Sequence, residues 1–229
     1  MSVKPILFNT DMVRAILGGR KTVTRRLVDI DISNQFDLEV DGTVICYIDQ
    51  STGDSHNHIN LCRYHLGDIL YVRETFGNWC LEYPESNATY YQYRADYPDG
   101  ARTYMYDEGN ECDLPKWHPS IHMPKEAARI WLKVTGVRVE RLLRMSHEAA
   151  RQEGIHYCES PDGFTWKTET DMNCCYVTPS GAFEALWNST VNKADIDRYG
   201  WESNPWVWVI EFERCEKPEG QHEEDKWKG

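Results

Sequence analysis

The hydrophobic and polar positions near the N-terminus predict one short helix. Apolar residues in segment 11–17 recur at i, i+1, i+4 and i+5, which places them on one helical face. Polar residues able to cap a helix occupy positions 9–11. Gly18 and Gly19 follow, and glycine readily adopts the left-handed conformation that ends a helix. We therefore expect a helix over 11–17 that stops directly before a basic segment.

Most of the remaining pattern is typical of short strands. Segments 69–73, 128–142 and 205–213 are rich in apolar, β-branched and aromatic residues, so we expect them to be core strands. Turn residues predict hairpins at 40–43, 97–100 and 160–163. Two further helices are expected at about 146–153 and 180–190. Many short strands with few helices predict an α+β fold, built as a small, partly open β-barrel with short flanking helices and β-hairpin insertions.

Composition and charge narrow the class of protein. The 229 residues fit one domain over 1–215, followed by a polar, flexible tail over 216–229. We find neither the roughly 18 consecutive apolar residues of a membrane span nor a secretory signal, so we expect a cytoplasmic protein with no membrane partner. The eight irregularly spaced cysteines are then expected to be reduced thiols. The net charge of −12 argues against bulk attraction to nucleic acid. The sequence does not indicate an oligomeric state.

Positive charge is concentrated in one place. Arg20, Lys21, Arg25 and Arg26 fall within seven residues that contain no acidic residue. In an acidic protein this cluster indicates a site for a small anionic or polar ligand, or a local contact with nucleic acid. The alternative is a solvated loop.

The segment Gly19–Arg26 fits the pattern G-x-K-x-x-T-x-R. Three other segments with recognisable patterns follow it along the chain. These are Gly67–Glu74, Ser146–Gly154 and the strand after Asn204-Pro205. Together they resemble the ASCH family, whose domains have a PUA-like β-barrel fold. Many members carry Glu at the position of Thr24, and Thr there is similar to the N4-acetylcytidine amidohydrolase branch. The resemblance leaves segments near 77–116 and 156–178 as insertions.

The resemblance implies that Lys21, Thr24 and Glu153 form a catalytic centre. In one assignment Lys21 is the base and Thr24 attacks the amide. In the other, Glu153 activates water while Lys21 and Thr24 stabilise the oxyanion. The neighbouring arginines lower the pKa of Lys21 and Glu153 raises it, so the sequence does not fix the net direction. In a regular strand, Lys21 and Thr24 would face opposite sides, unless the chain bends after the glycines.

Glu153 is expected to pair with a cation, because it lies at a helix end where the helix dipole disfavours a carboxylate. Lys21 is the natural partner, and the alternative is a solvent-exposed Glu at a frayed helix end.

The candidate ligand-binding residues extend beyond this centre. They are Gly19, Arg20, Arg25, Arg26, Arg73, Glu74 and Trp117. Trp117 lies in a proline-bounded loop and could stack on a flat base or simply pack the loop. Arg73 and Glu74 are interpreted either as a structural ion pair or as pocket lining.

We expect a protein that binds or acts on a modified pyrimidine nucleoside, with amide hydrolysis of N4-acetylcytidine as the specific hypothesis. The alternatives are a non-catalytic RNA-binding module and a ribonuclease. No cofactor is implied. Histidines and a cysteine within 56–65 match no standard zinc spacing, so no metal site is expected.

Overall fold

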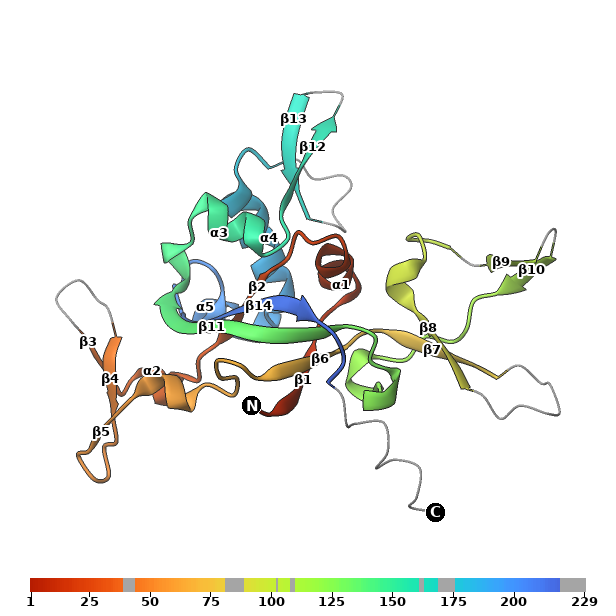
Figure 1. Cartoon of the computed structure of the whole chain (residues 1–229). Coiled ribbons are helices and arrows are strands. Elements are labelled where there is room, and N and C mark those ends of the chain that lie inside the picture. The colour runs from red at the N-terminus through yellow and green to blue at the C-terminus, as the bar shows by residue number, and fades with distance from the viewer. Residues whose placement is uncertain are drawn as a thin grey trace, which may run out of the picture.

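A central sheet of five strands organises the molecule (Figure 1). The computed structural model describes residues 1–38, 44–80, 89–101, 103–107, 110–160, 163–168 and 176–218. Across the sheet the strand order is β1 (Val3–Leu7), β6 (Ile69–Arg73), β11 (Trp131–Arg141), β14 (Trp206–Cys215) and β2 (Val23–Leu27). β1 and β6 are parallel, and the other neighbouring strands are antiparallel. With helices packed on this sheet, the predicted α+β class is confirmed.

The sheet is open in the part of the chain that the structure describes, because β1 and β2 are its two edges. These edges approach each other at one point. The guanidinium of Arg26 on β2 donates a 2.7 Å hydrogen bond to the carbonyl of Leu7, the last residue of β1. The same guanidinium lies 5.3 Å from the centre of the Phe8 ring. The sheet is therefore not a closed barrel, and the PUA-like barrel stays a prediction.

The predicted helices at 11–17, 146–153 and 180–190 are confirmed, with boundaries close to those expected. The α-helices are α1 (Thr10–Leu17), α2 (Ile30–Ser33), α3 (His147–Gln152), α4 (Pro179–Thr190) and α5 (Ile196–Tyr199). Short 3-10 helices are η1 (His58–Leu61), η2 (Arg94–Asp96), η3 (Ser120–His122), η4 (Lys125–Ala127), η5 (Leu142–Arg144) and η6 (Lys193–Asp195). None of the described helices is long and apolar enough to cross a membrane.

Small ladders project from the central sheet, and they correct one prediction. They are β3 (Phe36–Leu38) with β4 (Val44–Ile48) and β5 (Ser55–His56), β7 (Phe76–Cys80) with β8 (Thr89–Tyr93), β9 (Thr103–Asp107) with β10 (Asn110–Asp113), and β12 (His156–Ser160) with β13 (Gly163–Lys167). The predicted hairpin at 160–163 is present, since Ser160 pairs with Gly163. The hairpin predicted at 97–100 is wrong, because β8 pairs with β7 and β9 pairs with β10.

The flanks of the first predicted hairpin pair as β3 and β4, whereas its turn at 39–43 lies outside the described residues. The predicted tail likewise lies outside them from residue 219 onward.

The central sheet buries both faces, and this determines the surroundings of β2. On β14, Trp206, Trp208, Ile210 and Phe212 pack into one cluster with α1 and β1, whereas Val207 and Val209 pack into another with α3 and α4. Facing residues of paired strands share a side, and Thr24 and Arg26 face Ile210 and Trp208. The alternation of β2 therefore sends Thr24 and Arg25 to opposite sides of the sheet.

The end of α1 positions the basic segment. Asn9 caps the helix by accepting a hydrogen bond from the Met12 amide. At the other end Gly19 has a φ of 70°, a left-handed conformation that the following turn requires. The chain folds back on the helix, and the amides of Arg20 and Lys21 both donate to the Ala15 carbonyl.

Candidate functional site

Residues 21 and 22 join the end of α3 to the central sheet. Lys21 and Glu153 form an isolated antiparallel bridge. The Thr22 amide donates to the Gln152 carbonyl over 2.9 Å, and the Thr22 carbonyl accepts from the Phe212 amide over 2.9 Å. The backbone therefore holds Lys21 beside Glu153, although 132 residues separate them.

Lys21 is buried with three acceptors around its Nζ. The ammonium donates to Glu153 Oε2, to the Val23 carbonyl over 2.8 Å and to the Glu153 carbonyl over 3.1 Å. Burial lowers the pKa of Lys21 from its ordinary value, which Glu153 opposes and the neighbouring arginines reinforce. Three acceptors match the three donors of a charged ammonium. The ion pair predicted for Glu153 is present, and Glu153 is not a frayed surface residue.

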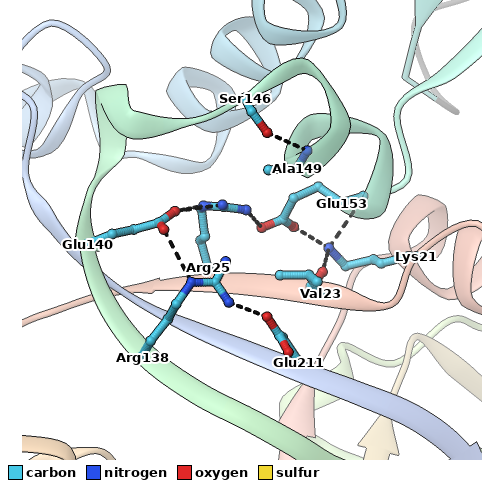
Figure 2. Close-up of polar contacts among 9 residues, drawn as sticks. All are labelled: Lys21, Val23, Arg25, Arg138, Glu140, Ser146, Ala149, Glu153 and Glu211. Atoms are coloured by element: carbon cyan, nitrogen blue, oxygen red, sulfur yellow. Dashed lines mark hydrogen bonds and ion pairs between the residues drawn. The ribbon is translucent and has the colours of Figure 1, made fainter.

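Arg25 takes the other oxygen of Glu153 and extends the cluster (Figure 2). Its Nη1 donates to Glu153 Oε1 over 3.0 Å, and its Nη2 donates to Glu140 Oε1 over 2.7 Å. Glu140 in turn contacts Arg138, which pairs with Glu211 near the surface. Cations and anions alternate along this network, so each buried charge has a partner of opposite sign.

Thr24 and Glu153 line one small cavity. Its volume is about 60 Å³, and its other walls are Met12, Arg25, Arg26, Phe183, Leu186, Trp187 and Thr190. Four of these residues belong to α4, so this helix forms one wall of the cavity. Glu153 contacts Lys21 directly and shares this cavity with Thr24, whereas Lys21 does not line the cavity and the Thr24 side chain lies on the other side of the sheet from Arg25. We name Lys21, Thr24 and Glu153 the inner centre.

The basic segment is not a solvated loop. Lys21 and Arg25 are buried in ion pairs, and Arg26 is half-buried between Leu7 and Phe8. Arg20 and Gly19 line a separate surface pocket instead. The four cations of the segment therefore do not form one continuous surface.

Three other predicted site residues have partners away from the inner centre. Arg129 donates two hydrogen bonds to Glu74, from Nε to Oε1 over 2.9 Å and from Nη2 to Oε2 over 3.0 Å. Burial raises the pKa of Glu74, and Arg129 opposes this shift. Arg73 donates to the Met123 carbonyl over 2.7 Å. Of the two interpretations for this pair, the structure supports structural ion pairing for Glu74, with Arg129 rather than Arg73 as its partner.

Trp117 packs against the 94–99 loop. Its ring centre lies 5.6 Å from that of Tyr97, and the guanidinium of Arg94 lies 5.9 Å from it. This is the packing alternative that the proline-bounded loop allowed. The contacts give Trp117 no role at the inner centre.

The surface pocket contains residues that the sequence did not single out. It has a volume of about 340 Å³ and is lined by Gly19, Arg20, Thr22, Glu148, Arg151, Gln152, Ile155, His156, Tyr157 and Trp166. A turn signal at 160–163 predicted the β12–β13 hairpin, but nothing in its pattern indicated that this hairpin would stand beside Arg20. We name this surface the outer pocket.

The histidines and cysteines of the described residues lie apart from one another. Among them, no group of three or more His, Cys, Asp or Glu side chains is placed to hold a metal ion. Within 56–65, His65 lies 3.7 Å from Asp68, and Cys62 is buried in the core. Cys46, Cys62 and Cys215 are free thiols, and the other cysteines lie where the structure describes no side chain.

Comparison with known proteins returns no matching family, no matching curated protein and no matching solved structure.

Proposed function

We propose that this chain is an ASCH-type protein with a PUA-like core that binds a modified pyrimidine nucleoside and hydrolyses its exocyclic amide. N4-acetylcytidine is the substrate of the specific hypothesis. The observation that carries the proposal is that buried Glu153 contacts Lys21 directly and lines one cavity with Thr24. Their sequence positions alone do not require this arrangement.

The PUA-like core has support from the approach of the two edge strands. The Arg26 side chain of β2 reaches the Leu7 carbonyl at the end of β1, and one cluster of buried residues draws on β1, β6, β11 and β14 together.

The contacts of Lys21 favour one of the two chemical assignments. An ammonium that donates to three acceptors has no lone pair, so Lys21 does not serve as the base in this state. Glu153 then accepts a proton from water as the water oxygen attacks the acetyl carbon. The tetrahedral oxyanion is stabilised by Lys21 and the Thr24 hydroxyl. Cleavage of the C–N bond, with return of the proton to the amine, releases cytidine and acetate.

Access to this centre requires movement of α4. A cavity of about 60 Å³ is far below the roughly 300 Å³ at which small-molecule pockets begin. The base can enter only if side chains of α4 withdraw from Thr24. The proposal therefore includes an open state in which this helix, or its side chains, has moved.

A non-catalytic nucleoside- or RNA-binding module is the second candidate. Both carboxylate oxygens of Glu153 already accept hydrogen bonds from cations, Lys21 on one side and Arg25 on the other. Such contacts stabilise the charged carboxylate and weaken it as a base. This observation favours binding without turnover, and it makes the hydrolysis assay decisive.

The test is acetate release from N4-acetylcytidine by wild type, Thr24→Val and Thr24→Ser. Valine replaces threonine at nearly equal volume but lacks the hydroxyl, whereas serine keeps it. We expect Thr24→Val to lower kcat/KM by roughly a hundredfold, as loss of one oxyanion donor does, and Thr24→Ser to retain most of the activity. Circular dichroism and thermal melting are the folding controls.

Wild-type protein that binds the nucleoside without releasing acetate would establish the binding module instead. Equal activity in Thr24→Val and wild type would remove Thr24 from the chemistry. A protein that neither binds nor hydrolyses the nucleoside contradicts the whole proposal.

A further inference from the structure

Another pocket lies where the start of β14 meets α2 and α5, and it shares no residue with the inner centre. Its volume is about 150 Å³. It is lined by Val28, Ile30, Ser33, Asn34, Arg141, Arg198, Tyr199, Ser203, Pro205 and Trp206. Among the residues that the structure describes, no acidic side chain lines it, whereas two arginines do. We name this site the arginine pocket.

Arg141 is fixed in this pocket by a ring and a carbonyl. It faces Trp206 across the β11–β14 pair, and its guanidinium lies 4.4 Å from the centre of the Trp206 ring. Its Nη1 donates to the Asn204 carbonyl over 3.0 Å. Asn204 is held in turn, because its side chain accepts a hydrogen bond from the Leu143 amide over 2.9 Å. No carboxylate of the described residues forms an ion pair with Arg141, so its charge is positioned but not neutralised.

Arg129 shows how the same chain treats another guanidinium that lies on a ring. It is 3.9 Å from the centre of the Tyr93 ring, and it also donates to both oxygens of Glu74. Burial lowers the pKa of Arg129, but Glu74 and Asp96 outweigh it, and the net shift is upward. The pKa of Arg141 is lowered by burial, with no carboxylate to oppose it. Arg141 therefore has the ring contact of Arg129 without the carboxylate, and an anion from outside the chain would supply that partner.

Arg198 brings a second positive charge to the arginine pocket. It is an exposed residue of α5, and its guanidinium lies 5.1 Å from the centre of the Tyr199 ring. Within the described part of the chain it has no ion pair either. Its acidic neighbours in sequence, Asp197 and Glu202, do not line the pocket. The site is therefore locally positive on a protein whose net charge is −12.

The side chains of this pocket suit one kind of anion. Guanidinium groups match the oxygens of a phosphate, and the amide of Asn34 at the end of α2 can donate a further hydrogen bond. The volume is about half of the roughly 300 Å³ at which pockets for whole small molecules begin. The pocket is therefore large enough for a phosphate group but too small for an entire nucleotide.

We propose that the arginine pocket binds a phosphate group between Arg141 and Arg198. The phosphate belongs either to a small monoester or to the backbone of a nucleic acid, and the rest of that molecule lies outside the pocket. The inference goes beyond the proposed function and does not depend on it, because it uses no residue of the inner centre.

The experiment measures binding of inorganic phosphate to the whole protein by calorimetry, near neutral pH and at constant ionic strength. Arg198→Ala should weaken binding roughly tenfold, because it removes a charge-assisted contact. Arg63→Ala is the matched control and should leave the affinity unchanged. It also deletes an exposed arginine, whose guanidinium lies 5.7 Å from the ring of the neighbouring Tyr64. Phosphate that does not bind the wild type, or that binds Arg198→Ala equally well, overturns the proposal.

Two further variants separate a phosphate site from an arginine that only packs on Trp206. Asn34→Asp places a carboxylate in the pocket at nearly equal volume, so it should abolish phosphate binding by repulsion. Arg141→Lys keeps the charge but loses the planar donor groups, so it should weaken binding severalfold. Thermal melting without phosphate is the folding control. Unchanged phosphate binding in a folded Asn34→Asp protein contradicts the assignment.

Two larger ligands distinguish the sources of the phosphate. Ribose 5-phosphate carries a monoester and no base, whereas a hexacytidine RNA with a 5′-hydroxyl carries only diesters. If the source is a small monoester, the sugar phosphate should bind more tightly than the RNA. If the source is a nucleic acid backbone, the RNA should bind more tightly, with an affinity that falls steeply with salt. Either order supports the site when Arg198→Ala weakens the tighter ligand, and no effect of Arg198→Ala on that ligand contradicts it.

Discussion

Glu153 shows how a residue can look exposed in sequence and be buried in the fold. It caps the end of α3, where the helix carbonyls repel a carboxylate. Lys21 and Arg25 supply the compensating charge, and only 3% of the Glu153 side chain is exposed. A buried charge with its partners in place is tolerated, but removal of one member leaves the others unpaired in a low-dielectric site.

Replacement of Glu153 by Gln should therefore destabilise the protein. We expect the free energy of unfolding to fall by about 3 kcal/mol, because Lys21 and Arg25 would remain buried without their shared anion. Glu148→Gln is the matched control, since Glu148 lies on the same helix with 65% of its side chain exposed. That control should change stability by less than about 0.5 kcal/mol. Urea denaturation measures the change in stability of both variants, provided that the dependence of the unfolding free energy on urea concentration stays the same.

A Glu153→Gln protein as stable as wild type would mean that the ion pairs contribute no net stability. If stability falls as expected, loss of hydrolysis in this variant cannot by itself identify Glu153 as a catalytic base. The Thr24 variants are then the cleaner test of chemistry, because they leave every charge in place.

At the scale of elements, the turn after α3 sets the position of the inner centre. Gly154 has a φ of 105°, a region that L-residues with a side chain rarely adopt. A Cβ at Gly154 would lie 2.9 Å from Cβ of Ala15 on α1 and 3.5 Å from Cβ of Lys21. This glycine therefore lets α3 end close against α1, with Glu153 beside Lys21.

Gly154→Ala should lower stability by more than backbone strain alone. Gly100 provides the comparison, since its φ is 77° and a Cβ there would meet nothing within 4 Å. We expect Gly100→Ala to cost about 1 kcal/mol and Gly154→Ala to cost about 3 kcal/mol, because only the latter also displaces α1. Chemical denaturation gives both values, and equal losses would show that the close approach to Ala15 is readily relieved.

The spacing of apolar residues predicted the elements whose type is determined by residues within the same segment. α1, α3, α4, β6, β11 and β14 follow from apolar spacing and from caps within the same segment. The sequence predicted less well which strands pair with each other. A Pro-Asp-Gly turn at 98–100 specifies a reversal but not which strands pair, and there the flanking strands take other partners. β1 was not among the expected strands, and it contains Pro5, which an edge strand tolerates.

The candidate site was predictable to the same degree. The motif and the helix-end carboxylate together indicated the Lys21–Glu153 pair, because a misplaced charge needs a partner. The second cation on Glu153, Arg25, was assigned to ligand binding, since a strand alone does not reveal which side faces α3. The rings of the outer pocket depend on how a hairpin stands beside a helix, and no short segment encodes that placement.

At the scale of the whole molecule, α4 forms one wall of the cavity beside Thr24 and Glu153. Its residues Phe183 and Trp187 also belong to the core cluster that packs against Val207 and Val209. Leu186 differs from them because it is only partly buried and lines both small cavities beside Glu153. Truncating the side chain at this position therefore enlarges the cavity beside Thr24 with less loss of core packing than truncating Phe183 or Trp187.

Leu186→Ala should make the inner centre easier to reach. If the nucleoside binds only when α4 has withdrawn, its apparent dissociation constant includes the free energy of that opening. The smaller side chain lowers the free energy of opening, so the KM for N4-acetylcytidine should fall by roughly threefold to tenfold. Stability should fall by about 2 kcal/mol at the same time. Leu143→Ala, at a leucine of η5 that is 45% exposed, should change neither quantity appreciably. An unchanged KM in a destabilised Leu186→Ala protein would mean that the nucleoside does not enter the cavity beneath α4.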